Sequence, residues 1–172
     1  MRHTSAYWIK KLELEKHPEG GYFKEVYRSG EFIEKSALPK RFIGKRCFGT
    51  SIYFLLKKEN ISAFHMICSD ETWHFYYGDT VYINIIDKTG NLNRVKLGNE
   101  PSKREVLQYT VPAGAWFAAS ISVDNKNNRY SYCLVGCTVA PGFDFSDFKM
   151  GERDKLLKKY PQHKEIIISH TY

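Results

Sequence analysis

The sequence has no segment with the character of a membrane span or a secretion signal. Its 172 residues contain no uninterrupted apolar run near the ~20 residues that a transmembrane helix requires. Residues 1–13 also lack the apolar centre of about 7–15 residues that defines a signal peptide. We therefore expect no membrane partner and a cytoplasmic location.

Cysteines are few, and none is spaced for a disulfide. The four are Cys47, Cys68, Cys133 and Cys137, without any CxxC. If Cys133 and Cys137 share a strand, their Cα atoms are roughly 13 Å apart, whereas a disulfide needs about 7 Å or less. This pattern predicts free thiols in a reducing compartment.

No nucleic-acid-binding motif accompanies the positive charge of the chain. There are 26 Lys and Arg against 19 Asp and Glu, a formal charge of +7, but the basic residues are scattered. Zinc-finger, RRM and KH patterns are absent from the sequence. We predict a solvated basic surface and no nucleic-acid partner, with a positive field that can steer an anionic substrate.

Internal repeats, low-complexity segments and linkers are also absent, whereas aromatic residues are abundant. Twelve Tyr and eleven Phe, among 42% apolar residues, favour strands around one sizeable core, so we predict a single domain over residues 1–172. Helices are expected over 5–14 and 153–160, and a long exposed loop over 29–45. About nine or ten short strands are expected, with turns at close spacing, which is typical of an antiparallel sandwich or barrel. The clearest strands are 22–28, 48–56, 62–67, 73–77, 80–86, 93–97, 105–111, 116–123 and 130–140, with a polar turn at 124–129.

One stretch, residues 62–78, places three titratable side chains close together in sequence. His65, Glu71 and His74 lie on two aromatic-rich runs around a polar turn. Side chains alternate between the faces of a strand, so a Glu71 that points inward puts His74 outward unless a bulge intervenes. Alternation alone does not say which of the three side chains point into the interior, and the direction of His74 stays open.

Several motifs, in order along the chain, resemble the cupin-5 (DUF985) family. They are HPEGGYFKEVYRS at 17–29, SIYFLL at 51–56, DETWHFYYG at 70–78, VPAGAW at 111–116 and GCTVAPGFDF at 136–145. The resemblance implies an all-β fold: the cupin antiparallel jelly-roll barrel with short N- and C-terminal helices, paired as a homodimer. It also implies a likeness to the sugar-nucleotide epimerase branch of the cupins, because members of the family are labelled predicted sugar epimerases.

The resemblance allows a residue-by-residue test of the usual cupin metal site, whose motifs run G-x5-H-x-H-x3,4-E-x6-G and G-x5-P-x-G-x2-H-x3-N. His65 and Glu71 match the first His and the Glu. Ile67 stands where the second His is expected, and Phe117 replaces the His of the second motif. A transition metal normally needs three or more N, O or S ligands from protein. We therefore predict no bound metal and no other cofactor.

The remaining pair still permits acid–base chemistry, because a His beside a carboxylate exchanges protons near neutral pH. Epimerisation or isomerisation next to a carbonyl needs one base and one acid. By resemblance to the epimerases of this fold, His65 is the base and Glu71 is its partner or a hydroxyl acceptor. The acid is Tyr22 or Tyr53, and the residues alone do not choose between them.

A sugar or sugar phosphate would need aromatic walls, hydrogen-bonding groups and a cation for the phosphate. The binding candidates are Trp73, Phe75, Trp116 and Phe145 as walls, Glu25 and Gln108 for hydroxyls, Lys24 and Arg28 for a phosphate, and His74 if it points inward. The aromatic loop 141–148 is expected to cover the mouth of the pocket.

These features favour a metal-independent epimerase or isomerase that acts on a sugar or sugar phosphate. Two alternatives remain open: a non-catalytic cupin that binds a carbohydrate-like small molecule, and a metal-dependent cupin enzyme. A stoichiometric transition metal would favour the metal-dependent enzyme, and binding without turnover would favour the binding protein.

Overall fold

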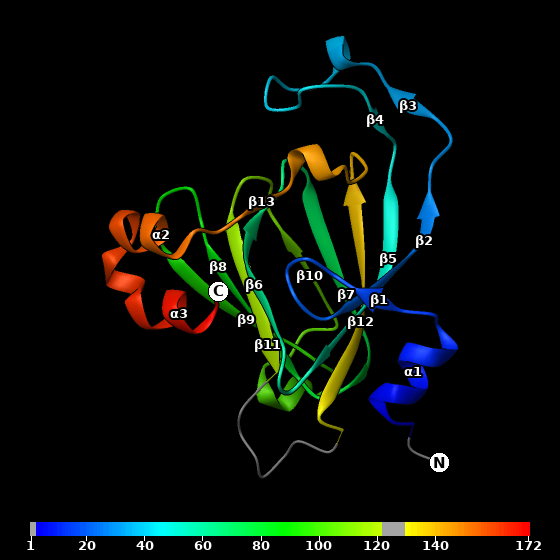
Figure 1. Ribbon diagram of the computed structural model, residues 1–172, viewed down its shortest axis with the longest axis vertical. Helices are drawn as coiled ribbons and strands as arrows, with labels where there is room; N and C mark the ends of the chain where they lie inside the picture. The colour runs from blue at the N-terminus through cyan, green and yellow to red at the C-terminus, as the bar shows by residue number, and fades with distance from the viewer. Residues whose placement is uncertain (1–2, 122–129) are drawn as a thin grey trace.

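Two antiparallel β-sheets enclose the core of the molecule (Figure 1). The computed structural model describes residues 3–121 and 130–172, so the polar turn expected at 124–129 lies outside the described residues. The larger sheet contains, in spatial order, β1 (Glu15–Lys16), β2 (Tyr22–Arg28), β5 (Thr50–Lys57), β12 (Tyr132–Ala140), β7 (Asp70–Gly78) and β10 (Gln108–Val111). The smaller sheet contains β13 (Lys149–Met150), β6 (Ile61–Met66), β11 (Trp116–Ile121), β8 (Val81–Ile86) and β9 (Leu92–Leu97). The prediction of an all-β antiparallel architecture is confirmed.

The core lies between the two sheets, where alternate residues of each strand point inward. Phe54 and Trp73 come from the larger sheet, and Ile83, Ile85 and Phe117 come from the smaller one; all five are at most 2% exposed. Burial of a large apolar side chain contributes about 1.5–3 kcal/mol, so this layer is the main stabilising element of the fold.

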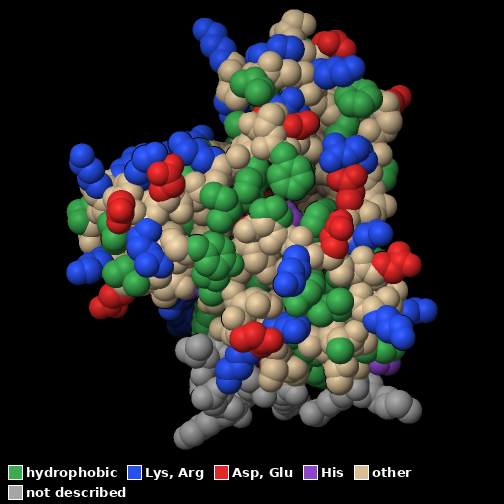
Figure 2. Space-filling view, in the orientation of Figure 1, with side chains coloured by type: hydrophobic (Ala, Val, Ile, Leu, Met, Phe, Trp, Pro, Cys, Tyr) green, Lys and Arg blue, Asp and Glu red, His purple; other side chains and the backbone are tan. Residues whose placement is uncertain are grey.

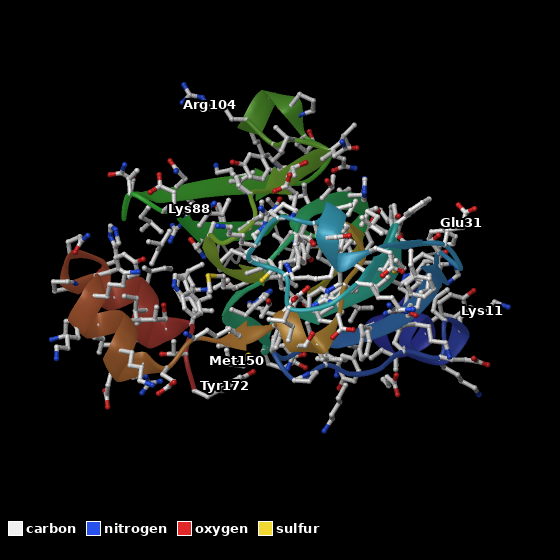
Figure 3. All side chains as sticks on the ribbon, turned by 90° about the horizontal axis from the view of Figure 1, so that it is seen from above. Lys11, Glu31, Lys88, Arg104, Met150 and Tyr172 are labelled. Carbon is white, nitrogen blue, oxygen red and sulfur yellow. The ribbon has the colours of Figure 1, made fainter. Side chains whose placement is uncertain are left out.

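Short helices cover the outer faces of the two sheets. Helix α1 (Ser5–Lys11) packs Trp8 against the larger sheet, and the indole Nε1 donates to the Tyr132 hydroxyl at 3.0 Å. Helices α2 (Arg153–Lys159) and α3 (Lys164–Ser169) cover the smaller sheet with Leu156 and Ile167. Seen from above, α1 and the α2–α3 pair lie on opposite sides of the sheets (Figure 3). Within the described residues, no helix is both long enough and apolar enough to cross a membrane.

The segment predicted as a long exposed loop has more structure than expected. Residues 29–49, here called the arm, project beyond the barrel (Figure 1) and contain the strand pair β3 (Phe32–Ile33) and β4 (Arg46–Cys47) with a 3-10 turn, η1 (Lys35–Ala37). Strands β1 and β13 and helix α3 were likewise not predicted, because two-residue strands and a six-residue helix carry too little periodicity to read. The remaining 3-10 turns are η2 (Pro101–Lys103), η3 (Phe145–Asp147) and η4 (Pro161–His163).

Register shifts interrupt three strand pairings, those of β6 with β11, β2 with β5 and β7 with β12. The last two decide where side chains proposed for the site point. In β2 the register shifts between Glu25 and Tyr27, so Arg28 reaches the same side as Glu25 rather than the opposite one. In β7 a shift follows Phe75, and Tyr77 then packs on the outer face beneath α1. Because this second bulge comes after His74, it leaves His74 pointing outward, as regular alternation requires.

Candidate functional site

A cavity opens between β2, β5, β7 and β12 of the larger sheet and β6 of the smaller one. Its empty volume is about 640 Å³, counted out to the open mouth. The lining residues are His17, Glu19, Phe23, Glu25, Arg28, Thr50, Ile52, Phe54, His65, Ile67, Glu71, Cys137, Val139, Phe143, Phe145 and Phe148. Figure 2 shows a hollow on this face in which a histidine side chain is visible among hydrophobic ones. This concave and mostly apolar space, with a few convergent polar groups, has the character of a ligand site.

A tight turn ahead of β2 brings Glu19 into the cavity. Gly20 and Gly21 have φ values of 108° and 74°, which glycine adopts readily. A Cβ on Gly20 would collide with the Ile61 carbonyl and the Tyr172 hydroxyl, so the turn lies directly against β6. The Glu19 carbonyl accepts from the Ala63 N–H at 2.8 Å and from the Tyr172 hydroxyl at 3.2 Å. These contacts hold the backbone so that the Glu19 side chain points inward.

Glu19 and His65 form a buried pair. The Nε2 of His65 lies 3.1 Å from Oε2 of Glu19, and the other carboxyl oxygen accepts from the Ser62 hydroxyl at 2.7 Å. The Nδ1 of His65 lies 2.8 Å from the Ala63 carbonyl, which can only accept, so Nδ1 carries a proton. A hydrogen bond between Nε2 and Oε2 therefore contains one shared proton, held as a carboxylic acid beside a neutral imidazole or as a carboxylate beside an imidazolium.

His17 completes the polar end of the cavity. Its Nδ1 accepts from the Glu19 backbone N–H at 3.3 Å and lies 3.5 Å from Oε2 of the same residue. The ring packs edge-on against Phe23, with 4.6 Å between ring centroids. Burial lowers the pKa of His17, although the Glu19 carboxylate opposes this shift. His17 is thus held as a neutral imidazole that orients the turn.

Burial also shifts the pKa values of the other titratable groups in the cavity. Desolvation raises the pKa of Glu19 and lowers the pKa of His65. Desolvation raises the pKa of Glu71 to about 7, and the nearby Glu19 adds to this shift while His65 opposes it. Burial also raises the pKa of the neighbouring Cys137 thiol, so that thiol stays protonated. Glu71 can therefore exchange a proton near neutral pH.

The pKa of Glu71 makes folding stability depend on pH. Between the ordinary pKa of 4.5 and the folded value of about 7, the native state keeps the proton that the unfolded state releases. Stability is therefore highest below the unfolded pKa and falls as the pH rises through the folded pKa, by about 3 kcal/mol from this group. His17 and His65 act in the opposite direction, because their pKa values are lowered. The measurement is the difference in urea-unfolding free energy between wild type and Glu71→Gln across this pH range. We expect this difference to change by about 3 kcal/mol between the two pKa values. A difference that stays constant with pH would contradict the raised pKa of Glu71.

Three phenylalanines on one segment close the mouth of the cavity. Phe143, Phe145 and Phe148 contact one another, with ring centroids 5.0–6.2 Å apart, and Phe148 also stacks on His65 at 5.4 Å. We call this segment, residues 143–148, the lid. The prediction that an aromatic loop lies over the pocket agrees with this arrangement.

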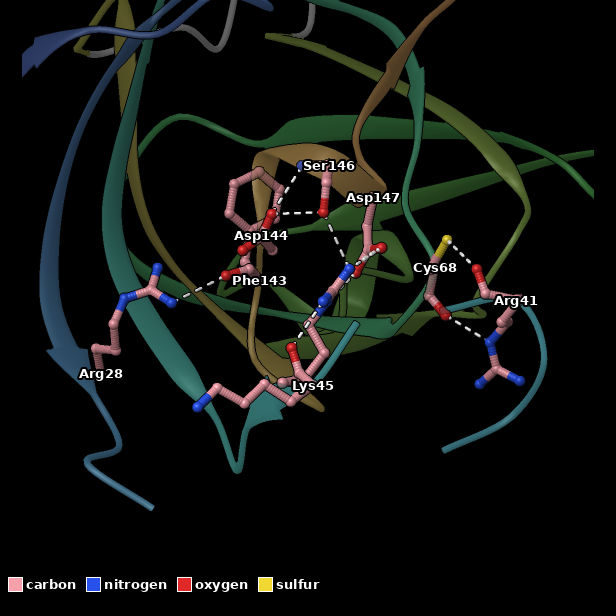
Figure 4. A network of polar contacts seen from close by, with 9 residues as sticks. Arg28, Arg41, Lys45, Cys68, Phe143, Asp144, Ser146 and Asp147 are labelled. Carbon is pink, nitrogen blue, oxygen red and sulfur yellow. Dashed lines mark hydrogen bonds and ion pairs between the residues drawn. The ribbon is translucent and has the colours of Figure 1, made fainter. Parts of the chain in front are cut away.

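The lid is fastened to the arm by a buried ion pair (Figure 4). The Arg46 guanidinium donates to Asp147 through Nε at 2.6 Å and through Nη2 at 2.5 Å, and both side chains are only 4% exposed. Arg46 also donates to the Ser146 hydroxyl at 3.0 Å and to the Lys45 carbonyl at 2.7 Å. Further along the rim, Arg28 donates to the Phe143 carbonyl at 3.1 Å. Bidentate pairing of this kind fixes orientation, so the arm sets the position of the lid.

Five of the side chains proposed from the sequence meet in this cavity: His65, Glu71, Glu25, Arg28 and Phe145. The first two lie in its interior, and the other three lie at its mouth, where they are more exposed.

The two tyrosines proposed as the acid lie on the outer face of the larger sheet. Tyr22 packs in the cluster beneath α1, with the Lys57 ammonium over its ring. Tyr53 contacts Tyr76, with 6.1 Å between ring centroids. Alternation along β5 turns Phe54 into the core and therefore turns Tyr53 away from it. Among the described residues that line the cavity there is no tyrosine, so neither position can supply the acid.

The position of Tyr53 on the outer face can be tested by substitution. We expect Tyr53→Phe to leave catalysed proton exchange within about twofold of wild type, because its hydroxyl cannot reach a ligand in the cavity. NMR-monitored exchange of a carbonyl compound in D₂O measures this, and a loss of tenfold or more would return Tyr53 to the reaction.

The other proposed binding residues also lie outside the cavity. Trp73 and Phe75 point inward but belong to the packed core between the sheets. Trp116 packs on the outer face of the smaller sheet beneath the C-terminal helices. Lys24 faces outward, 3.5 Å from Glu13.

His74 and Gln108 belong to an outer-face cluster on the larger sheet. Nδ1 of His74 lies 3.2 Å from the Gln108 amide oxygen, and Nε2 lies 3.1 Å from the Thr138 hydroxyl. Both residues sit opposite each other in the β7–β10 register, on the face away from the core. They therefore do not reach a ligand held in the cavity.

The metal that the cupin fold implies does not fit these residues. Ile67 lines the cavity, and Phe117 faces His65 across the β6–β11 register with 4.0 Å between ring centroids. The apolar side chains of Ile67 and Phe117 thus occupy two positions where metal ligands are expected. The Nε2 of His65 faces the Glu19 carboxyl and not a metal position. In the described part of the chain no three His, Cys, Asp or Glu side chains are grouped as ligands. We derive no step through a metal.

Sequence reasoning missed His17 and Glu19, although both lie in the HPEGGY motif. The Pro and paired Gly were read only as a turn, and a turn does not reveal which side chain it points inward. A carboxylate next to two glycines was the available signal, because such a turn can approach another strand closely.

The chain is similar to known proteins both in its fold and in its sequence. The structure is similar to that of oxalate decarboxylase from Bacillus subtilis, with a TM-score of 0.54 and 16% sequence identity. The match covers 90% of this chain and 36% of that one. At this identity the likeness concerns the fold alone. The family model of the cupin superfamily (DUF985) matches residues 6–151, so the chain belongs to that family.

Two solved structures are similar to this chain over nearly its whole length, and one curated protein is similar over most of it. A hypothetical protein from Leishmania major has a TM-score of 0.90 and 38% identity, covering 99% of both chains. A protein from Shewanella oneidensis has a TM-score of 0.87 and 35% identity, again over 99% of both chains. An uncharacterized protein of Saccharomyces cerevisiae is 33% identical over 84% of this chain and 74% of its own length. These relatives support the fold and the family, and the function must be argued from the site.

Proposed function

We propose that the protein is a metal-independent acid–base enzyme, an isomerase or epimerase of a small carbonyl compound. The observation that carries this proposal is the buried contact of 3.1 Å between Oε2 of Glu19 and Nε2 of His65, in the same cavity as Glu71. Movement of a proton next to a carbonyl needs a base and an acid with pKa values near the working pH. The resemblance to sugar epimerases implies a sugar or sugar phosphate as the substrate.

The contacts of His65 support a different division of roles from the one that the epimerase resemblance implies. Both of its nitrogens are engaged, with Ala63 and with Glu19, so His65 is a positioning residue. In our assignment the Glu71 carboxylate takes the proton from the carbon next to the carbonyl. The Glu19 carboxyl, with the proton it shares with His65, protonates the carbonyl oxygen, and an enol forms.

The reverse transfers complete the reaction. Isomerisation follows when Glu71 returns its proton to the former carbonyl carbon and the ionised Glu19 takes the proton of the hydroxyl on the adjacent carbon. Epimerisation follows when the enol turns over before Glu71 returns its proton to the original carbon. No atom is gained or lost and no electron acceptor is needed, so the cycle closes with the groups that line the cavity.

The test is solvent exchange at carbon, which does not require knowledge of the product. The purified protein is incubated in D₂O with a panel of aldoses, ketoses and hydroxyketones, and loss of the C–H signal is followed by NMR. We expect exchange with at least one member that stops in His65→Ala. Binding without any exchange would contradict the proposed enzymatic activity and would favour a non-catalytic binding protein.

A homodimer, which the family resemblance implies, is also part of the proposal. Large apolar side chains are exposed on β2 and the arm: Val26, Tyr27, Phe32, Ile43 and Phe48 are 49–74% exposed. Such a concentration favours contact with another protein surface. Light scattering coupled to size exclusion should give twice the mass of the chain for wild type and the monomer mass for Ile43→Lys; a monomeric wild type would contradict the proposal.

A further inference from the structure

The wall of the cavity is mostly hydrocarbon. The strands contribute Phe23, Ile52, Phe54, Ile67 and Val139, and the lid adds its three phenylalanines. Such a surface favours a ligand body with little polar area, because apolar contact is gained without leaving hydroxyls unpaired.

Most polar groups of the wall already have partners within the protein. The Thr50 hydroxyl accepts from the Phe143 backbone N–H at 3.0 Å. One carboxyl oxygen of Glu19 is engaged with Ser62 and the other with His65. A polyhydroxylated sugar would lose water from several hydroxyls and find few replacements, and each unpaired group costs about 1–3 kcal/mol.

The charges in the cavity disfavour an anion as well. Arg28 is the one Lys or Arg among the described lining residues, and its Nε and Nη2 donate to the two carboxyl oxygens of Glu25 at 2.9 and 2.7 Å. Beyond it lie the carboxyls of Glu19 and Glu71. A phosphate would therefore meet a cation that is already paired, and the ionised form of Glu71 would repel it.

We propose that the substrate of this cavity is an uncharged carbonyl compound with a mainly hydrocarbon body, and neither a sugar phosphate nor a highly hydroxylated sugar. The proposal rests on the acid–base function proposed above, and it replaces the sugar or sugar phosphate that the family resemblance implies as the substrate. The carbonyl end lies toward Glu19 and Glu71, and the hydrocarbon body lies under the lid. The positive charge of the chain is then a property of its outer surface and plays no part in recognition.

Three α-hydroxyketones of increasing polarity and charge test this inference. The probes are 2-hydroxycyclohexanone, fructose and fructose 6-phosphate, and binding is measured by ligand-observed NMR and by thermal shift. We expect saturable millimolar or tighter binding of 2-hydroxycyclohexanone, and binding of the other two at least tenfold weaker. Fructose 6-phosphate or fructose binding as tightly as the cyclic ketone would overturn the proposal, as would no binding of the cyclic ketone in the millimolar range.

A charge variant tests the reason for the exclusion. Glu25→Gln frees the Arg28 guanidinium at the mouth, so it should strengthen binding of fructose 6-phosphate severalfold and leave that of 2-hydroxycyclohexanone unchanged. An equal change for both probes would contradict the role given to the Glu25–Arg28 pair.

Exchange at carbon, measured on the same samples, separates this inference from the proposed function. If 2-hydroxycyclohexanone binds but its α-proton does not exchange, the ligand class stands and the enzyme assignment fails. If fructose 6-phosphate binds and exchanges faster, the enzyme assignment stands and the ligand class fails.

Discussion

Replacement of Arg46 by alanine is expected to lower the free energy of unfolding by about 3–5 kcal/mol. The substitution leaves the Asp147 carboxylate buried without its two guanidinium hydrogen bonds, and it also removes the bonds to Ser146 and Lys45. A buried charge that loses its partner keeps the full cost of desolvation. Urea denaturation followed by fluorescence measures the change.

Two further variants separate the lost ion pair from a general effect of truncation. Glu152 forms an ion pair with Lys155 at 2.7 Å on the exposed surface of α2, so Glu152→Ala should cost no more than about 1 kcal/mol. The double variant Arg46→Met with Asp147→Leu removes both charges and should recover most of the stability lost in Arg46→Ala. A double variant as unstable as the single one would show that the ion pair itself is not the cause.

The strands of this chain could be predicted because their residues alternate between the core and the outer face of each sheet. Alternation in β5 and β7 places Phe54 and Trp73 inward and Tyr53 and His74 outward, and this period is visible in the sequence. The bulge in β2 could not be predicted, since no glycine marks it, and it is this bulge that brings Arg28 beside Glu25. Local periodicity therefore gives the layers, and the exceptions that shape the cavity depend on pairing with a distant strand.

The candidate site was predictable only in part, for a related reason. His65 and Glu71 lie within one stretch that matches the cupin motif, and this match predicts their inward direction. Glu19 lies 46 residues before His65 in the chain, and the contact between them exists because the glycine turn packs against β6. Such a contact is a product of tertiary structure. In the proposed mechanism this contact makes His65 a residue that positions Glu19, in place of the role of base.

Replacement of Glu71 by glutamine is expected to slow α-proton exchange of 2-hydroxycyclohexanone by a factor of roughly 10²–10⁴, the usual contribution of a general base. The amide keeps the size of the side chain but cannot accept a proton from carbon. Binding of the ketone, followed by ligand-observed NMR, should stay within about threefold of wild type, because the same shape fills the wall. A loss of binding that accounts for the whole rate effect would place Glu71 in recognition instead of proton transfer.

The pH profile adds a readout that a structural role of Glu71 would not change. A base acts in its ionised form and the Glu19 acid acts in its protonated form. The exchange rate of wild type should therefore rise with pH through about 7, the pKa of Glu71, and fall again where the Glu19–His65 pair loses its shared proton. The charged or titratable groups that face it are His65 from β6, Glu19 from the turn before β2 and Cys137 from β12. Their protonation contributes to the apparent value, so the comparison must be made within matched variants. Glu13→Gln, which changes an exposed glutamate far from the cavity, should keep the profile of wild type. In Glu71→Gln the rise near pH 7 should disappear, and its persistence would transfer the role of base to the Glu19–His65 pair.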